Sequence, residues 1–472
     1  MKNNENNKDL NNNNLNLLLS KIPSVEIILQ NKALKPLIQK YSRKILTQTV
    51  RKVISEEKKN ARKNSHLYSA QERINKIKEY LEKENVSYLQ KVINGSGVIL
   101  HTNLGRAPLG EEILKTIQNT LQGYINLEYD LIEGNRGKRG EIVEKLLCTL
   151  SHSEKSLIVN NNAGAIFLIL NTLAKNKEVI VSRGELVQIG GGFRIPEILE
   201  QSGAHLREVG TTNQTFIGDY EKAINENTSL ILKVHQSNFH MNGFVHQVEV
   251  KELKKLGGKY NLPVVVDLGS GTFLATETFG LKHEPTVQEN IRAGADIVCF
   301  STDKLLGGPQ GGAICGKEIY LKKISQHPLF RTLRVDKMAL TILQEVLLYY
   351  LKDEAVTKIP IWKMISCPLE KIELRSQNIC QELKEEGIPA FTKEGQTAIG
   401  GGSLPGQTLP TKLIIIKPPC PVEIFSKELR LSHPPLLGRK EKEYFVLDPR
   451  TIDPSTDNLV IKIIKSVYSK MK

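Results

Sequence analysis

The sequence has little of what would indicate an extracellular or membrane protein. It holds only six cysteines in 472 residues, and no two of them form a CxxC pair. A disulfide framework and a thiolate metal site are therefore not expected, no metal is predicted, and a reducing cytoplasm is the expected compartment. No apolar run approaches the roughly 18 residues of a membrane span, and the first 14 residues contain no apolar stretch. We expect neither membrane association nor a secretory signal.

The composition is that of a globular protein with an uneven charge distribution. Hydrophobic residues make up 40 % and charged residues 25 % of the chain, which excludes general disorder. Residues 1–90 contain 18 Lys and Arg against 9 Asp and Glu, a net charge of +9, whereas the whole chain carries +14. A basic terminal module on a nearly balanced body favours a polyanionic partner such as RNA or DNA. The alternative is a solvated, Lys-rich helical face without such a partner.

Helical periodicity follows the asparagine-rich start of the chain. Pro23, Ser24 and Glu26 are typical of the entry to a short helix. Apolar residues then recur at steps of mostly three or four in two stripes: Leu34, Ile38, Tyr41, Ile45 and Val53, then Ala70, Ile74, Ile77 and Leu81. This spacing predicts a small helical module.

From about residue 92 the pattern changes to short β-branched runs separated by helix-length stretches. The runs are residues 157–159, 179–181, 230–232, 264–266 and 297–299. Alternating strands and helices predict an α/β fold with a mainly parallel sheet, in which ligands bind at the strand ends. After about Tyr350 the pattern predicts a smaller α+β domain. At roughly 100–200 residues per domain, the length predicts two to four domains.

Lys304 comes five residues after the last of these runs, just beyond the predicted strand, and precedes a glycine-rich turn. The order of a phosphate-binding P-loop is absent, because Lys304 comes before the glycines. A second interpretation is a Schiff-base lysine held against a cofactor aldehyde, with Ser301 close by for a phosphate. The third is an ordinary loop lysine.

Two further residues at strand ends favour the cofactor interpretation. Asp267 follows residues 264–266 and is placed to pair with a pyridinium nitrogen, although an aspartate there could also cap a turn. Asn238 ends the preceding strand and could donate to a ring oxygen. The order Asn, Asp, Lys, with steps of 29 and 37 residues, is that expected of a pyridoxal-phosphate (PLP) enzyme of the aspartate-aminotransferase fold.

The segment that joins the first strand to its helix is a candidate phosphate site. It contains Asn162, Ala163 and Gly164, small residues at a helix start. Free backbone N–H groups and the positive end of the helix dipole favour an anion there. An ordinary strand-to-helix turn with asparagine caps is the alternative.

Six segments resemble one family, the bacterial selenocysteine synthases, or L-seryl-tRNA(Sec) selenium transferases. They are residues 93–109 (INGSGVILHTNLGRAPL), 126–130, 182–187, 331–337, 400–405 and 434–439. The resemblance runs from about residue 20 to the C-terminus. It implies a cytoplasmic, PLP-dependent transferase of selenocysteine biosynthesis that converts seryl-tRNA(Sec) to selenocysteyl-tRNA(Sec). The family reaction eliminates the seryl hydroxyl to give an aminoacrylyl intermediate and adds selenium from selenophosphate.

The resemblance also implies roles for matching positions. Lys304 would carry PLP, Asp267 would pair with the pyridinium nitrogen, and Asn238 would lie beside the ring. Arg106, Arg331 and Arg334 would hold selenophosphate, and guanidinium groups suit such an anion. Thr211 and Thr212 would line the same pocket. The family further implies a homo-oligomer, a decameric ring of dimers.

We therefore expect five segments along the chain. They are an Asn-rich disordered tail (1–16), a basic helical tRNA-binding domain (17–85), a linker (86–106), a PLP-binding catalytic core (107–348) and a C-terminal α+β domain (349–472).

The chain departs from the family pattern at a few positions. Family members commonly have Ala-Thr at Gly95-Ser96, Gly at Thr302, Ala at Gly311 and a larger aliphatic residue at Ala313. Two rival functions stay open. One is a PLP-dependent lyase or transferase acting on a small amino acid or amino sugar without RNA, and the other is a non-catalytic tRNA-binding protein.

Overall fold

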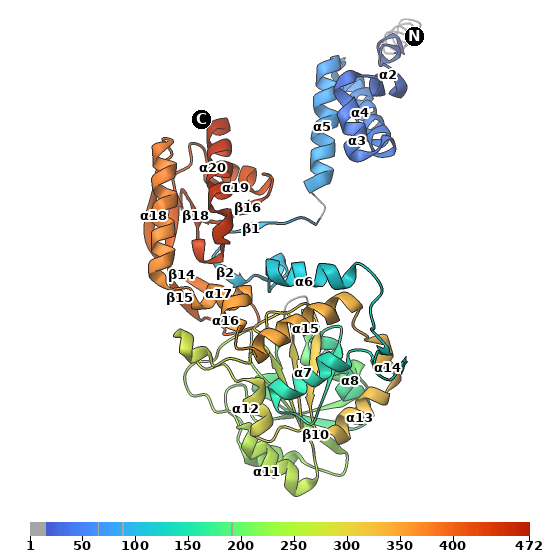
Figure 1. The fold of residues 1–472 in the computed structure, drawn as a ribbon, viewed down its shortest axis with the longest axis vertical. Coiled ribbons are helices and arrows are strands. Elements are labelled where there is room, and N and C mark those ends of the chain that lie inside the picture. Colours follow the sequence, from blue (N-terminus) through green and yellow to red (C-terminus); the bar gives the residue numbers. More distant parts are fainter. Residues whose placement is uncertain (1–15, 65, 87–88, 190–191) are drawn as a thin grey trace, which may run out of the picture. The chain divides into compact units, whose positions relative to one another are not determined.

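The computed structural model describes residues 16–64, 66–86, 89–189 and 192–472. The chain divides into two compact units, Met1–Lys91 and Val92–Lys472 (Figure 1). Apart from its last residue, the expected Asn-rich tail lies outside the described residues. No described helix is both long and apolar enough to cross a lipid bilayer.

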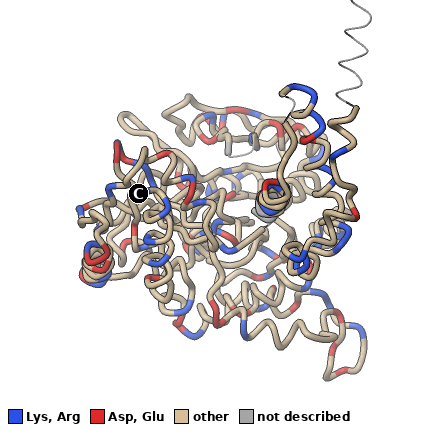
Figure 2. Tube along the Cα trace, turned by 90° about the horizontal axis from the view of Figure 1, so that it is seen from above, with Lys and Arg blue, Asp and Glu red and all other residues tan. Residues whose placement is uncertain are grey.

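The first unit is helical. Its helices include α2 (Val25–Leu29), α3 (Lys35–Tyr41), α4 (Arg43–Asn64) and α5 (Ala70–Val86), with a 3-10 turn η1 (Lys32–Leu34). Ser24 caps α2 by accepting from the Ile27 N–H, as its sequence context predicts. Figure 2 shows basic residues (blue) and acidic residues (red) along the whole chain, so both units carry charges of both signs.

The apolar stripes of this unit form its core. Leu34, Val53, Ile74, Ile77 and Leu81 are buried in one cluster, while Ile38, Tyr41 and Ile45 are partly buried against it. Ala70 is exposed because it lies at the first turn of α5. A buried ion pair between Arg73 and Glu57, 2.7 Å long, ties α5 to α4.

The second unit contains a seven-stranded sheet in the order β5-β13-β12-β11-β10-β6-β9. The strands are β5 (Lys155–Val159), β6 (Glu178–Ser182), β9 (His205–Val209), β10 (Thr228–Val234), β11 (Val264–Gly269), β12 (Ile297–Ser301) and β13 (Gly312–Gly316). All neighbours pair in parallel except β13, which is antiparallel to both β5 and β12.

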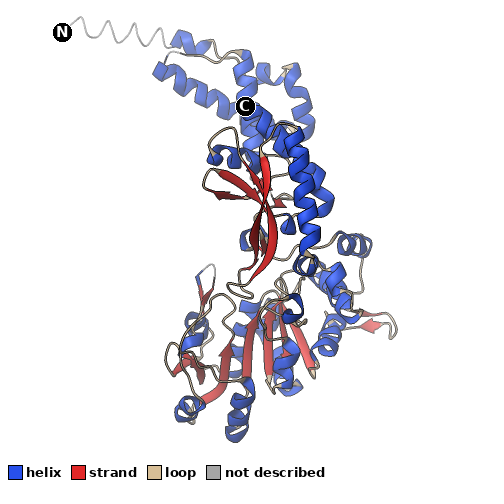
Figure 3. Ribbon diagram, turned by 90° about the vertical axis from the view of Figure 1, so that its left-hand side faces the viewer, coloured by secondary structure: helices blue, strands red, loops and turns tan. Residues whose placement is uncertain are grey.

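Helices cover both faces of this sheet (Figure 3). Val266 and Val298 pack with α7 (Glu141–Ser151) and α15 (Lys337–Leu351) in one cluster. Their chain neighbours Val265 and Ile297 pack with α8 (Asn162–Leu173) and α13 (Glu318–Gln326) in another. Burial on both faces explains why these strands are uninterrupted apolar runs.

A second sheet has the order β17-β18-β15-β14-β2. Its strands are β2 (Val98–Leu100), β14 (Ala390–Gly400), β15 (Thr408–Ile416), β17 (Arg439–Glu441) and β18 (Tyr444–Leu447), and β1 (Ile93–Asn94) pairs separately with β16 (Leu436–Leu437). One face packs on α18 (Leu369–Glu385), α19 (Val422–Arg430) and α20 (Asp457–Met471). Part of the segment expected as a linker thus forms strands with C-terminal residues.

The remaining elements connect these layers. They are α6 (Glu111–Leu121), β3 (Tyr129–Asp130), β4 (Asn135–Arg136), β7 (Gln188–Ile189), β8 (Phe193–Arg194), α9 (Ile195–Gln201), α10 (Ile217–Ala223), α11 (Val250–Tyr260), α12 (Val287–Arg292), α14 (Pro328–Thr332), α16 (Ala355–Lys358) and α17 (Pro360–Ser366).

The predicted α/β class is confirmed, and all five β-branched runs are strands of the large sheet. The prediction missed β9 and β13. β9 is an edge strand whose residues are mostly exposed. β13 is an interior strand with glycine at both ends, a residue that weakens a strand pattern, so its three apolar residues were not recognised.

Candidate active site

Lys304 and Asp267 lie together at the ends of adjacent strands. Asp267 in β11 is in register with Val234 of β10 on one side and Cys299 of β12 on the other. Lys304 follows β12, and both Lys304 and Asp267 are 4 % exposed. A Cβ atom placed on Gly269 would lie 3.7 Å from Lys304 Nζ, so the amine reaches the end of β11.

The surroundings of Lys304 favour its neutral amine. Burial lowers the pKa of Lys304, and the positive charge of Arg106 lowers it further, while Asp267 and Asp303 oppose the shift. A neutral amine is the form that can react as a nucleophile or accept a proton.

Asp267 is a buried carboxyl near the end of β11. Burial raises its pKa, against the hydrogen bond from Asn162 and the charge of Lys304. Asn162 Nδ2 donates to Asp267 Oδ1 over 2.8 Å. A carboxyl in this setting is stabilised as an anion by a positively charged partner.

The predicted phosphate residues gather at the start of α8. Asn162, Ala163 and Gly164 form its first turn, and the Gly164 N–H already donates to Asn161 Oδ1 over 2.7 Å. Ser301 is brought to this turn by sheet register, because it pairs with Gly312, which pairs with the last residue of β5. The turn and Ser301 thus lie at the same end of the sheet, where β5 and β12 finish.

These residues fit PLP, the cofactor that the sequence resemblance implies. Among the described residues, Asn162 Oδ1 and Ser270 Oγ are buried without a hydrogen-bond partner. PLP requires an amine for its aldehyde and a carboxyl for its pyridine nitrogen, and both are present and buried here. It also requires polar atoms for its ring substituents and a helix start for its phosphate, which the unpaired atoms and the first turn of α8 provide.

A loop of the second sheet closes over Lys304. Gly402, in the turn after β14, has φ +81°, and a Cβ atom there would lie 2.7 Å from Lys304 Nζ. The positive φ favours glycine at this position, and a larger residue would displace the Lys304 amine.

The other predicted strand-end residue, Asn238, is placed differently. Its side chain is exposed, and its Nδ2 donates to the Gln188 carbonyl over 2.7 Å. His235, nearer the strand, lies 3.2 Å from the buried carboxyl of Glu284, measured from Nε2 to Oε1. Sequence reasoning missed this pair because Glu284 lies in an irregular loop without a motif.

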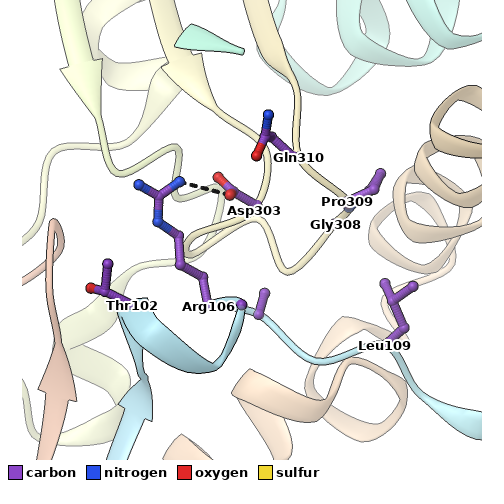
Figure 4. A pocket seen from close by; sticks show the side chains of 9 residues that line it. Thr102, Arg106, Leu109, Asp303, Gly308, Pro309 and Gln310 are labelled. Atoms are coloured by element: carbon purple, nitrogen blue, oxygen red, sulfur yellow. Dashed lines mark hydrogen bonds and ion pairs between the residues drawn. The ribbon is translucent and has the colours of Figure 1, made fainter. Parts of the chain in front are cut away.

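Arg106 lines a pocket of about 400 Å³ beside the lysine turn (Figure 4). Its Nη1 donates to Asp303 Oδ2 over 2.7 Å. Thr102, Leu109 and Gln310 also line this pocket. Asp303 was not predicted as a site residue, although its position directly before Lys304 was a usable signal.

Arg331 and Arg334 line a second pocket, of about 430 Å³. Its wall also contains Glu128, which directly precedes β3, and Glu144 from α7. Burial raises the pKa of Glu144 to about 7, against the charges of two nearby lysines. Within one chain, the three predicted arginines therefore line two pockets.

Thr211 and Thr212 line neither of these pockets among the described residues. They are exposed in the turn after β9, where Thr211 Oγ1 donates to the Gln214 carbonyl over 3.0 Å. The Thr212 carbonyl lies against Gly184.

Two departures from the family pattern contact each other. Thr302 Oγ1 donates to the Pro309 carbonyl over 2.5 Å. A Cβ atom on Gly311 would lie only 2.7 Å from this Thr302 hydroxyl oxygen. The larger residue at 302 therefore goes with the smaller one at 311. At Gly95, a Cβ atom would lie 2.8 Å from the Leu437 carbonyl oxygen, which explains the absence of alanine.

Comparison with known proteins places the chain among named relatives. The L-seryl-tRNA selenium transferase family model matches residues 92–453, and a model for the selenocysteine synthase N terminal region matches residues 19–56. The L-seryl-tRNA(Sec) selenium transferase of Carboxydothermus hydrogenoformans is 46 % identical, covering 93 % of this chain and 95 % of the relative. That of Clostridium botulinum (strain Langeland) is 40 % identical, covering 95 % and 98 %.

Among solved structures, D-glucosaminate-6-phosphate ammonia-lyase has the same fold. Its TM-score is 0.56 at 18 % identity, covering 81 % of this chain and 97 % of that chain. The predicted aspartate-aminotransferase-like fold is confirmed.

Proposed function

The chain belongs to the L-seryl-tRNA selenium transferase family, and we propose that it converts seryl-tRNA(Sec) to selenocysteyl-tRNA(Sec) with selenophosphate as selenium donor. The observation that carries this proposal is a buried lysine beside a buried aspartate, at neighbouring strand ends of a chain that matches the family over residues 92–453.

We assign the cofactor residues by their placement. Lys304 would attach PLP and Asp267 would hold the proton on its ring nitrogen. A place for Asn238 beside the ring rests on the family resemblance alone, since its exposed side chain donates to the Gln188 carbonyl. Residues 162–164 and Ser301 would receive the phosphate at the start of α8. Bound PLP supplies an electron sink for the negative charge that develops on the seryl Cα.

The chain itself supplies the proton transfers. Once its amine is no longer attached to PLP, Lys304 would accept the proton from the seryl Cα, and its lowered pKa supports this role because the neutral amine is the base. Burial alone favours the neutral form of Asp267. Its carboxylate is therefore kept anionic by a positive charge that faces it, such as a protonated ring nitrogen.

The selenium donor requires an anion site. Arg106, Arg331 and Arg334 would bind selenophosphate, whose oxygens accept parallel N–H donors from guanidinium groups. Because one chain places these arginines in two pockets, a second copy could complete the site. The homo-oligomer, a decameric ring of dimers as the family implies, is part of this proposal.

The helical N-terminal unit would bind tRNA(Sec). Its excess of Lys and Arg favours contacts with the phosphate backbone. The match of residues 19–56 to the family's N-terminal region supports the same assignment. We place the reaction in the cytoplasm, where the six cysteines, all free thiols, would stay reduced.

The test is to incubate the purified full chain with PLP, seryl-tRNA(Sec) and selenophosphate, then release and identify the esterified amino acid. Selenocysteine is expected on the tRNA, and free serine in place of seryl-tRNA should give no product. Lys304→Arg should abolish conversion, whereas Lys322→Arg, on the exposed face of α13, should not. Turnover of a free amino acid or amino sugar would favour the small-substrate alternative, and unchanged serine on the tRNA would contradict the proposal.

A further inference from the structure

The pocket lined by Arg331 and Arg334 is strongly cationic, and two carboxyl groups lie in its wall. Its cationic residues are Arg136, Lys138, Arg139, Lys155, Arg331 and Arg334, and its carboxyl groups belong to Glu128 and Glu144. Six like charges repel one another at short range, so their arrangement needs fixed partners. The two carboxyl groups differ in whether they provide one.

Glu128 contacts three of the arginines. Its Oε1 accepts hydrogen bonds from Arg334 Nη2 and, over 3.3 Å, from Arg139 Nη1. Arg136 Nη2 lies 3.5 Å from Oε2. Burial works to raise the pKa of Glu128, but the Arg139 hydrogen bond and the charge of Arg334 keep it below the usual value. Glu128 is therefore an anion at neutral pH.

Arg139 fixes the backbone beside Arg334. Its Nε and Nη2 donate to the Val335 carbonyl over 3.0 and 2.6 Å. On the other side of Arg334, the Leu333 carbonyl accepts from the Asn160 N–H over 3.0 Å. The segment that carries Arg334 is thus held at both neighbouring residues, once to Arg139 and once to the end of β5.

We propose that the pocket lined by Arg331 and Arg334 binds an anion, and that Glu128 and Arg139 are positioning residues for this anion pocket. Glu128 holds the Arg334 guanidinium by one Nη, which leaves its other N–H groups to bind the anion, and Arg139 holds the backbone on which Arg334 stands. Neither residue needs to touch the anion. This inference rests on the proposed function for the identity of the anion, but not for the existence of the pocket.

A positioning role and a purely electrostatic role for Glu128 have opposite consequences. If Glu128 only reduced the positive charge of the pocket, its removal would strengthen anion binding. If it orients Arg334, its removal lets the guanidinium turn away, and anion binding weakens although the pocket becomes more positive. The sign of the change therefore decides between them.

The experiment titrates inorganic phosphate into the PLP-loaded full chain by calorimetry, so that the phosphate site of the cofactor is already filled. Glu128→Gln should weaken phosphate binding about tenfold. The titrations are run well above pH 7, where Glu144, whose pKa is raised to about 7, is ionised as Glu128 is. Glu144→Gln is then the matched control, because it removes one negative charge from the same pocket and Glu144 forms no ion pair with an arginine among the described residues. It should leave binding unchanged or slightly tighter.

A double-mutant cycle separates orientation from general damage. The effect of Glu128→Gln should disappear in an Arg334→Gln background, because the oriented group is then absent. Arg139→Lys should weaken binding in the same direction while far-UV circular dichroism stays unchanged. With selenophosphate as substrate, Glu128→Gln should raise KM with little change in kcat.

Tighter phosphate binding by Glu128→Gln, or an equal loss in both backgrounds, would overturn the inference. So would an absence of phosphate binding by the unaltered protein. These titrations need no turnover, so a failure of seryl-tRNA conversion would be recognised separately.

Discussion

At the scale of single residues, burial and a neighbouring guanidinium act on Lys304 in the same direction. Both lower its pKa, and Arg106 is itself held by Asp303. The sequence predicted Lys304 and Asp267 because each lies at or just beyond the end of an apolar strand. It predicted Arg106 only through family resemblance, because nearly two hundred residues separate it from Lys304.

Arg106→Gln should therefore raise the pKa of Lys304, since it removes the cation and leaves the Asp303 carboxylate unpaired. The rate of PLP attachment, followed against pH by borohydride trapping, should reach its plateau at higher pH than in the unaltered protein. Arg183→Gln, which removes an exposed arginine paired with Glu208, should leave the profile in place. A profile that does not move in Arg106→Gln would contradict this electrostatic account.

The contact between Thr302 and Gly311 gives a second prediction at this scale. Gly311→Ala should reduce the free energy of unfolding by about 1–3 kcal/mol, the usual cost of overpacking. In a Thr302→Gly background the same change should cost much less, because the nearby oxygen is gone. Thermal midpoints of the two single variants and the double variant measure this coupling, and simple additivity would show that the two positions are independent.

At the scale of elements, the sequence predicted five strands of the large sheet from their β-branched runs and did not predict β2, whose pairing depends on distant residues. The run at residues 264–266 is apolar because successive side chains point to opposite faces of the sheet and both faces are covered: Val265 packs in one hydrophobic cluster and Val266 in another. By contrast, β2 joins the second sheet through β14, about three hundred residues away, and no local pattern encodes that pairing. Glu128 likewise gains its role only from contact with Arg334.

The turn after β14 offers a test of how one element affects another. Gly402→Ala should cost about 1–2 kcal/mol through its positive φ and should also displace the Lys304 amine, so PLP attachment should slow. Gly406→Ala is a matched control, because Gly406 has φ +72° but no atom within 4 Å of an added Cβ. Equal slowing in both variants would show that backbone strain, not contact with Lys304, is responsible.

At the scale of the whole molecule, the charge distribution separates the two units. The excess of basic residues before residue 91 was visible in the composition, but composition does not identify the nucleic acid. The identity of that partner rests on family membership. The proposed completion of the arginine site by a second copy is also beyond the sequence, because it depends on how the surfaces of two copies meet.

Neutralising basic residues of the helical unit should weaken tRNA binding. Arg51→Gln with Lys58→Gln, both exposed on α4, should lower the affinity for seryl-tRNA(Sec) and reduce the slope of log K against log salt by about 1 for each lost phosphate contact. Lys251→Gln with Lys255→Gln, exposed on α11, makes the same charge change in the other unit and should have little effect. Equal losses in both double variants would point to general electrostatic attraction.

The most direct measurement of the central claim is reductive trapping of PLP on the full chain, followed by peptide mass analysis. The account predicts one pyridoxyl group, on Lys304, with Lys304→Arg unlabelled under the same conditions. A pyridoxyl group found on another lysine, or no incorporation at all, would contradict it.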